Sequence, residues 1–372
     1  RGAGVSGYLG FGSVNEQAAK AARINRLVCG PDILSPVKDA ISKVAAREHL
    51  TEDEAALALA SIMDGEATPA QVAALLVGLR IKGESIEEIT GLARAMRDKS
   101  VKVTTTRTPL VDTCGTGGDT CKTFNVSTAA AFVAAGAEAA VAKHGNRSVT
   151  SKAGSADVLE ALGVNVNLDA DGVGRCIDTV GIGFLFARTL HPSMKYVGPV
   201  RAEIGIRTIF NAIGPLTNPA GATRQLIGVY DKDLCEPIAR VLLNLGSEHV
   251  LVVHGLIGLD EISTVGETVV AEGYKGQVIP FTINPGDLGL TEARPEDICA
   301  GEDPAENAAI LRGILSGAPG PRRALVVANA AAALYVAGIV PTLKAGVTRA
   351  AEVIDSGAAL AKLDALIAES NV

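Results

Sequence analysis

The chain has no tryptophan, and aromatic residues make up only 3% of its 372 residues, whereas 48% are hydrophobic. Its core must therefore be built from alanine, valine, leucine and isoleucine. No apolar run approaches the roughly 18 residues of a membrane span, so no membrane-spanning helix is predicted. The net charge of −7 argues against a nucleic-acid-binding face, which needs clustered lysine and arginine.

Cysteines are few and scattered, and none belongs to a C-x-x-C pair. This spacing favours reduced thiols over a disulfide framework or a zinc site. Cys114 and Cys121 flank a glycine-rich loop, where buried packing is expected rather than a nucleophilic role, because no histidine base is evident beside them. The six are Cys29, Cys114, Cys121, Cys176, Cys235 and Cys299.

Glycine, by contrast, is abundant, with 41 residues, about 11% against a usual value near 7%. The stretch 112–155 holds two polar, glycine-bearing loops separated by a short helix and a short strand. Ser127 or Thr128 is expected to cap the helix, which ends at Gly136, and residues 139–142 are expected to form the strand. This is a βαβ unit, so both loops are expected at the carboxyl edge of an open sheet, where ligands bind.

The two loops together predict a phosphate-binding cradle. The first, at 115–119, reads G-T-G-G-D, and its three glycines let backbone amide groups approach a ligand closely. The second, at 143–148, reads K-H-G-N-R-S and adds two fixed positive charges. Spacing excludes the G-x-G-x-x-G dinucleotide fingerprint, because its sixth place is Thr120, and also the P-loop, because no lysine and hydroxyl pair closes the loop.

The amino-terminal part is predicted to contain an extension and a helical domain. Residues 1–34 show no helical or strand period and are a tag remnant, a native extension or a trimmed targeting segment. Residues 35–102 are expected to form four short helices, three of them opened by capping residues at Thr51, Thr68 and Ser85. The helical domain is interpreted as an amphipathic packing or dimerisation module.

Residues 103–372 are predicted to form one α/β domain, because strands and helices alternate along them. The stretches 101–107 and 164–168 look strand-like, 276–300 reads as a loose β and turn region, and 348–369 as one helix. Further strands are expected at 183–187, 226–229 and 249–254, and further helices at 156–162, 172–180, 234–245, 305–316 and 322–337.

The segment 191–219 breaks this alternation with a Gly-Pro and an Asn-Pro step. It is expected to form a hinge that lines a cleft and to carry Arg201, Glu203 and Arg207 on one helix. A surface helix with a solvated charged face is the alternative interpretation of these charges.

Asp260 and Glu261 lie just past the expected strand at 249–254. Mg²⁺ is commonly held by one or two carboxylates together with substrate phosphates. An adjacent acidic pair is usually surface decoration, but beside a phosphate cradle it predicts a magnesium site.

Five ordered motifs are specific enough to name a family. Together they resemble anthranilate phosphoribosyltransferase, and the likeness runs from about Asp32 to the C-terminus. One departure is Ile257, where relatives often carry an acidic residue before L-D-E. The motifs are D-x-x-G-T-G-G-D at 112–119, N-V-S-T at 125–128, K-H-G-N-R at 143–147, the segment 191–219, and L-D-E-I-S at 259–263.

The resemblance implies an enzyme of tryptophan biosynthesis that transfers a 5-phosphoribosyl group from phosphoribosyl pyrophosphate to the amine of anthranilate and releases pyrophosphate. The implied fold is α/β. A small N-terminal helical domain, completed by hinge helices near 195–215, is joined to a large domain with a central, mostly parallel sheet, as in nucleoside phosphorylases.

The resemblance also assigns site residues. Lys143, Asn146 and Arg201 are implied as catalytic, and Ser127, Asp260 and Glu261 as ligands of Mg²⁺. The implied anthranilate-binding residues are Gly115, Asn146, His191, Tyr196 and Arg201. The implied phosphoribosyl pyrophosphate-binding residues are Gly115, Gly118, Asp119, Thr123, Asn125, Val126, Ser127, Thr128, Lys143, His144, Gly145, Asn146, Arg147, Ser148, Val149, Thr150, Ser151 and Ser155.

Two other functions stay open for the sequence alone: an enzyme like the pyrimidine nucleoside phosphorylases, and a non-catalytic relative that binds nucleic acid. The expected partners are anthranilate and phosphoribosyl pyrophosphate, with no nucleic acid and no membrane, and the expected assembly is a homodimer. A cytoplasmic location is expected, or an organellar one if residues 1–34 are a targeting remnant. His144 is expected to shape its loop rather than to act as a general base.

Overall fold

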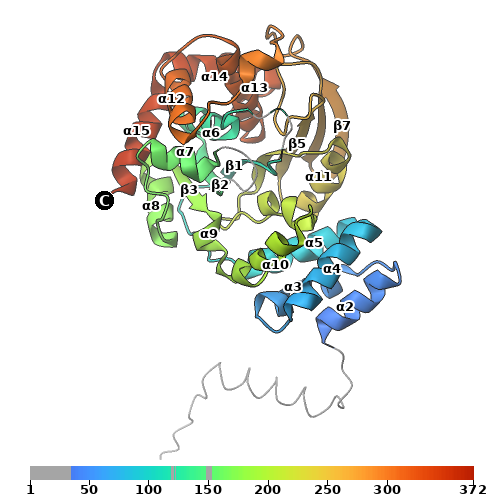
Figure 1. Ribbon diagram of the computed structural model, residues 1–372. Coiled ribbons are helices and arrows are strands. Elements are labelled where there is room, and N and C mark those ends of the chain that lie inside the picture. Colours follow the sequence, from blue (N-terminus) through green and yellow to red (C-terminus); the bar gives the residue numbers. More distant parts are fainter. Residues whose placement is uncertain (1–34, 119–120, 122, 148–152) are drawn as a thin grey trace, which may run out of the picture.

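The computed structural model describes residues 35–118, 121, 123–147 and 153–372. The predicted extension at 1–34 lies outside this part of the chain. No helix of the described residues is long and apolar enough to cross a membrane. Figure 1 shows a small lobe of helices from the first hundred residues, and above it a larger lobe built around a sheet. The predicted fold class, a small helical domain followed by an α/β domain, is confirmed.

Four helices form the small lobe, as the sequence predicts. The hydroxyls of Thr51, Thr68 and Ser85 each accept a hydrogen bond from the third residue of the helix that follows, and that residue's side chain returns to the capping amide. These capping boxes confirm the predicted helix starts. The helices are α2 (Pro36–Ala45), α3 (Glu52–Met63), α4 (Pro69–Lys82) and α5 (Ile86–Asp98).

The segment 191–219 joins this lobe to the larger one. It holds four short helices, η1 (Pro192–Tyr196), α10 (Gly198–Ile204), η2 (Ile209–Asn211) and η3 (Gly214–Leu216), of which α10 packs against α4. Val197 and Val200 are buried in the same apolar cluster as the four helices. Arg97 of α5 donates to the Leu216 carbonyl oxygen at 2.7 Å, so the small lobe is tied to the end of this segment as well.

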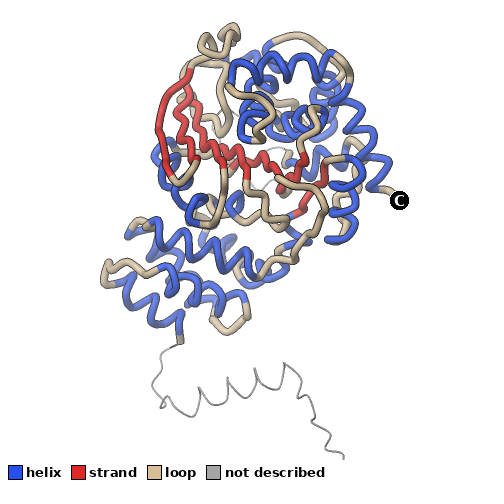
Figure 2. Tube along the Cα trace, turned by 180° about the vertical axis from the view of Figure 1, so that it is seen from behind, coloured by secondary structure: helices blue, strands red, loops and turns tan. Residues whose placement is uncertain are grey.

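The large lobe contains a seven-stranded sheet in the order β3-β2-β1-β4-β5-β6-β7. Its first five strands are parallel to one another, and the last two form an antiparallel hairpin at one edge. Figure 2 shows this sheet crossing the larger lobe between helices. The strands are β1 (Leu110–Gly115), β2 (Ala140–Gly145), β3 (Ile182–Phe186), β4 (Arg224–Gly228), β5 (His249–Gly255), β6 (Thr268–Tyr274) and β7 (Gln277–Ile283).

Helices cover both faces of the sheet. Along β5, Leu251 and Val253 belong to the apolar cluster that contains α6 and α13, whereas Val250 and Val252 belong to the cluster that contains α11. Strands buried on both faces explain the continuous apolar runs in the sequence. The helices of this lobe are α6 (Val126–Gly136), α7 (Ser155–Ala161), α8 (Ala170–Val180), α9 (Ala187–Leu190), α11 (Cys235–Asn244), α12 (Pro304–Leu315), α13 (Pro321–Val336), α14 (Leu343–Asp355) and α15 (Ala358–Ser370).

Two predicted strands are absent from the described residues. In 101–107, the amide of Val101 donates to the carbonyl of Leu190 at the end of α9, and the amide of Val103 donates to the carbonyl of Pro219, so this segment joins no ladder. In 164–168 the two valines are buried, but Asn165 donates to the hydroxyl of Ser370 in α15. Both segments are coil held against other parts of the chain, which explains their apolar pattern.

Three other boundaries differ from prediction. The predicted helix 348–369 is two helices, α14 and α15, because Gly357 lies between them in the left-handed region with φ 77°. Helix α6 begins one residue before Ser127, with Asn125 as its N-cap, and no side chain caps it. The region 276–300, predicted as loose β and turn, begins with strand β7, which pairs with the unpredicted strand β6. Lys275 and Gly276 form the turn between them, both with positive φ, and Lys275 gives little sequence signal for such a turn.

We predict that Gly91→Ala destabilises the protein. A Cβ at Gly91 would lie 2.1 Å from the Glu52 carbonyl oxygen of α3, so helices α3 and α5 would have to separate. Overpacking of this kind costs about 1–3 kcal/mol. The matched control is Gly313→Ala in α12, where a Cβ meets nothing within 4 Å and alanine is the better helix former. The midpoint of thermal unfolding should fall for the first variant alone; equal midpoints would contradict the proposed contact.

Candidate functional site

The candidate site lies where β1, β2 and β5 end. Strands β1 and β2 are parallel neighbours, so the two predicted loops leave the sheet at the same edge, as expected. Strand β5 is parallel to β4, and the chain that follows it brings Asp260 and Glu261 back over this edge. Contacts between these three segments build the site.

Asp260 touches the first loop directly. Its Oδ2 atom accepts a hydrogen bond from the Gly117 amide at 2.8 Å. A Cβ at Gly115 would lie 2.5 Å from the same oxygen, and a Cβ at Gly228, at the end of β4, would lie 1.5 Å from the Asp260 backbone oxygen. Both strand ends must therefore be glycine for the carboxylate to reach this position.

Glu261 lies at the start of helix α6. Its Oε1 atom accepts a hydrogen bond from the Ser127 amide at 3.0 Å, a favourable place for a carboxylate because the helix N-terminus carries a partial positive charge. The next residue, Ile262, is held through both its amide and its carbonyl by the buried side chain of Asn329 in α13. Sequence reasoning missed Asn329, although an asparagine within an alanine-rich helix was an available signal.

Lys143 brings a buried positive charge to the same point. The residue is only 2% exposed. Its Nζ atom donates to the Thr113 carbonyl oxygen at 2.6 Å and to the Ser127 hydroxyl at 3.3 Å. The Thr113 hydroxyl in turn donates to the Ser127 carbonyl at 2.9 Å. The structure thus brings Lys143, Ser127, Asp260 and Glu261 together at one edge of the sheet, and their roles in binding stay a prediction.

A buried aspartate fixes the base of the second loop. Asp112 accepts the His144 amide on Oδ1 at 3.0 Å and the Asn218 side-chain amide on Oδ2 at 2.8 Å. Asn218 also donates to the Ala142 carbonyl at 2.8 Å. Burial raises the pKa of the Asp112 carboxyl to about 6, although the nearby Lys143 and these hydrogen bonds act in the opposite direction.

The second loop is braced by α7. Ser155 donates to the Asn146 carbonyl at 3.3 Å, and the Asn146 side chain accepts the amide of Arg147 at 2.8 Å. The Arg147 guanidinium contacts Asp157 at 2.8 Å and Glu160 at 2.7 Å. One of the two charges predicted to face a phosphate is therefore already paired with carboxylates, and its role in phosphate binding stays a prediction.

His144 and His191 lie side by side, with ring centroids 5.2 Å apart. Burial lowers the pKa of His144 well below its usual value, and His191 and Lys143 lower it further. Burial also lowers the pKa of His191 to about 4, with a smaller effect of Lys102. Both rings are therefore neutral and weakly basic at neutral pH, which favours a shaping role for His144 over proton transfer.

The hinge segment places the remaining predicted residues. No described residue hydrogen-bonds either ring nitrogen of His191. Tyr196 is 40% exposed, and Arg201 lies with its Cζ 5.5 Å from the Phe210 ring centroid; burial lowers the pKa of its guanidinium. The prediction that Arg207 shares a helix with Arg201 is wrong, because α10 ends at Ile204 and the left-handed Gly205 follows it.

The other predicted phosphate-site residues surround the start of α6. Thr123 forms an isolated bridge with Cys299, and Asn125 donates to the Ala153 carbonyl at 3.3 Å. Val126 opens the helix, and the buried Thr128 hydroxyl has no hydrogen-bond partner among the described residues. Asp119, Ser148, Val149, Thr150 and Ser151 lie outside the described residues.

The carboxylates fit the predicted metal. Within the described ranges, no three His, Cys, Asp or Glu side chains gather as a complete metal site. Asp260 and Glu261 offer hard oxygen ligands, Ser127 offers a hydroxyl, and Mg²⁺ takes its remaining ligands from water and substrate phosphates. This donor set suits Mg²⁺ bound together with a diphosphate and does not suit a soft metal.

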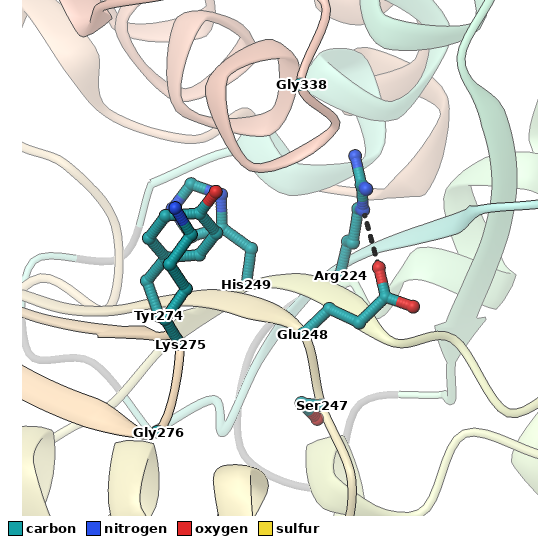
Figure 3. A pocket seen from close by; sticks show the side chains of 8 residues that line it. All are labelled: Arg224, Ser247, Glu248, His249, Tyr274, Lys275, Gly276 and Gly338. Atoms are coloured by element: carbon teal, nitrogen blue, oxygen red, sulfur yellow. Dashed lines mark hydrogen bonds and ion pairs between the residues drawn. The ribbon is translucent and has the colours of Figure 1, made fainter.

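A cavity of about 560 Å³ lies elsewhere, at the opposite ends of the strands (Figure 3). Arg224 and His249, which line it, are the first residues of β4 and β5, and Gly276 belongs to the turn between β6 and β7. Because ligands of open α/β sheets bind at the carboxyl ends of the strands, the loops after β1, β2 and β5 are the better candidate site.

Comparisons with known proteins show the family of the chain. Residues 107–360 match the glycosyl transferase family, α/β domain, and residues 38–100 match the glycosyl transferase family, helical bundle domain. An anthranilate phosphoribosyltransferase of Symbiobacterium thermophilum is 57% identical over 323 residues, which are 87% of this chain and 94% of that protein.

Two solved structures are also similar. The crystal structure of anthranilate phosphoribosyltransferase from Thermus thermophilus superimposes with a TM-score of 0.86 at 45% identity, over 90% of this chain and all of that one. The enzyme from Saccharomyces cerevisiae, in complex with phosphoribosyl pyrophosphate and Mg, gives 0.81 at 30% identity, over 90% of this chain and 98% of that one.

We predict that Asp112 makes stability depend on pH. Its pKa is about 6 in the folded protein against 3.8 for an ordinary aspartate, so the folded state binds more protons between these values. Its stabilising contribution is present below about pH 4 and is lost as pH rises through about 6, a change on the order of 3 kcal/mol. Unfolding by urea, measured from pH 4 to 7, should therefore show Asp112→Asn gaining on the parent protein as pH rises.

The control for this measurement is Asp178→Asn. Hydrogen bonds from Thr105 and Thr106 lower the pKa of Asp178, so its contribution has the opposite sign and is lost as pH falls. If Asp112→Asn and the parent protein kept a constant difference in unfolding free energy across the range, the raised pKa of Asp112 would be refuted.

Proposed function

The chain belongs to the anthranilate phosphoribosyltransferase family, and from this membership we propose how its own residues carry out the family's reaction. The enzyme transfers the 5-phosphoribosyl group from phosphoribosyl pyrophosphate to the amine of anthranilate and releases pyrophosphate, a step of tryptophan biosynthesis. The observation that carries the assignment of residues is the convergence of Gly117, Ser127, Lys143, Asp260 and Glu261 at one edge of the sheet.

Phosphoribosyl pyrophosphate binds between the two loops and the start of α6. The positive end of the α6 dipole favours an anion, and Lys143 adds a positive charge that is almost completely buried. The unpartnered Thr128 hydroxyl supports this placement. The binding residues are those predicted from the sequence, from Gly115, Gly118 and Asp119 through Thr123 and 125–128 to 143–151 and Ser155.

Mg²⁺ is held by Asp260, Glu261 and Ser127. Bound there, Mg²⁺ would supply positive charge facing the pyrophosphate leaving group. The support is the donor set itself, together with the yeast relative, whose structure contains phosphoribosyl pyrophosphate and Mg. Without a cation, two carboxylates beside a diphosphate would repel it.

Anthranilate binds against the hinge segment, at Gly115, Asn146, His191, Tyr196 and Arg201. The half-buried Arg201 guanidinium is suited to the anthranilate carboxylate, because it presents paired N–H donors in a partly desolvated place. The unpartnered ring nitrogens of His191 offer a further hydrogen bond.

The chemistry requires little proton transfer from the protein. Departure of pyrophosphate passes through an oxocarbenium-like state, and fixed positive groups facing the leaving phosphates stabilise it. Lys143, Asn146 and Arg201 are the catalytic residues in this account, since they hold the two substrates in place. The aromatic amine is neutral at pH 7 and attacks without a strong base, which agrees with the weakly basic His144 and His191.

The assembly and location complete the proposal. The helical domain at 35–102, completed by hinge helices near 195–215, packs against the catalytic domain at 103–372. Leu57 of α3 and Ile81 of α4 are exposed on this lobe, and the proposed assembly is a homodimer in the cytoplasm. Light scattering of the purified protein should give twice the mass of the chain.

The phosphorylase-like and nucleic-acid-binding alternatives have no support among the relatives described above.

We predict turnover that depends on the metal. Mixing the protein with anthranilate, phosphoribosyl pyrophosphate and Mg²⁺ should consume anthranilate fluorescence, and EDTA should abolish this loss. Asp260→Asn and Glu261→Gln should each raise the Mg²⁺ concentration needed for half-maximal rate by about tenfold or more. Saturable binding of phosphoribosyl pyrophosphate without any turnover would keep the phosphate site but overturn anthranilate as the acceptor.

We predict that Arg201→Ala raises the KM for anthranilate more than the KM for phosphoribosyl pyrophosphate. Loss of a charged carboxylate contact should cost about tenfold or more in anthranilate binding. Arg240→Ala is the control, because Arg240 lies on α11 and contacts Gly276, in the turn at the far end of the strands. An effect of Arg201→Ala on the KM for phosphoribosyl pyrophosphate alone would overturn the assignment.

A further inference from the structure

Arg207 connects the hinge segment to the glycine loop. It follows α10, and its Nη2 atom donates to the Gly118 carbonyl oxygen at 2.7 Å. A Cβ at Gly118 would lie only 2.6 Å from this nitrogen, and Gly118 has φ 79°, so the contact requires glycine in both space and backbone conformation. None of the roles assigned above uses Arg207.

The Arg207 guanidinium also contacts the ring of Tyr230. Its Cζ lies 4.6 Å from the centroid of the Tyr230 ring, a cation–π contact. Tyr230 follows β4, and its amide donates to the Thr116 hydroxyl at 3.1 Å, while the Thr116 amide donates to the Gly228 carbonyl at 2.9 Å. The glycine loop is thus fixed to the end of β4 on one side and to Arg207 on the other.

The hinge end of this connection is itself anchored. Four residues after Arg207, the Asn211 side chain accepts the Thr208 amide at 3.0 Å, and Ile209 and Phe210 are buried in the core of the small lobe. The Arg201 guanidinium lies against the Phe210 ring. One short segment therefore contains both Arg201, which is proposed to bind anthranilate, and Arg207, which contacts the glycine loop.

We propose that Arg207 is a positioning residue for the donor substrate: it binds the Gly118 carbonyl and so fixes the conformation of the glycine loop beside the proposed diphosphate site. This inference rests on the proposed function of that loop. A carbonyl oxygen facing a phosphate repels it, whereas one bound to a guanidinium has its partial negative charge satisfied.

Substitutions at Arg207 separate positioning from simple charge. Arg207→Met keeps length without a donor, and Arg207→Gln keeps a donor without charge. We expect Arg207→Met to raise the KM for phosphoribosyl pyrophosphate on the order of tenfold and to lower kcat. Arg207→Gln should recover part of this loss, with the KM for anthranilate changing by less than about twofold at saturating donor.

A matched pair at Tyr230 tests the same contact. Tyr230→Phe keeps the ring and should match the parent enzyme, whereas Tyr230→Leu should raise the same KM, and its effect should not add to that of Arg207→Met. The midpoint of thermal unfolding is measured for every variant, since a merely structural role would lower it and change both KM values alike.

The outcomes are distinguishable. An unchanged KM for phosphoribosyl pyrophosphate in Arg207→Met, with an active parent enzyme, overturns the positioning role alone. If Arg207→Gln is as impaired as Arg207→Met while Arg207→Lys matches the parent enzyme, charge and not positioning explains the effect, and the inference also fails. An inactive parent enzyme would instead overturn the proposed function.

Discussion

The buried carboxylate of Asp112 is the interaction on which the site depends. It lies on β1, accepts the His144 amide of β2, and accepts the side chain of Asn218, the residue before Pro219 at the end of the hinge segment. One side chain thus links three segments that carry proposed binding residues. Burying an ionisable carboxyl is costly, and the raised pKa of Asp112 records that cost, which Lys143 and the two hydrogen bonds only partly offset.

Glycine sets the second constraint, because it determines how closely the acidic loop can approach the strands. Gly115 and Gly228 are neighbours in the β1–β4 ladder, and both face Asp260. Any side chain at either position would occupy the space of the aspartate. The next residue of this loop, Glu261, accepts the Ser127 amide at the start of α6. The close approach of the loop to the strand ends therefore places a carboxylate at the same helix N-terminus that is proposed to bind the phosphates.

Much of this arrangement could be predicted from the sequence, because the signals were local. Capping boxes marked the starts of three helices, and a strand-loop-helix-strand order fixed both loops at one edge. Contacts between distant segments left no such signal. The pairing of Arg147 with α7, the support of Ile262 by Asn329 and the reach of Arg207 to Gly118 depend on side-chain directions that only the folded chain defines.

The charges of the site explain why the reaction can proceed without a strong base. Buried Lys143 and half-buried Arg201 are positive, whereas burial keeps His144 and His191 neutral. The reaction builds negative charge on the leaving pyrophosphate, and its nucleophile is already neutral, so fixed cations help more than a proton acceptor would. Rate should then depend chiefly on how firmly the loops are held, so residues remote from the reacting atoms, Asp112 and Arg207 among them, are expected to affect it.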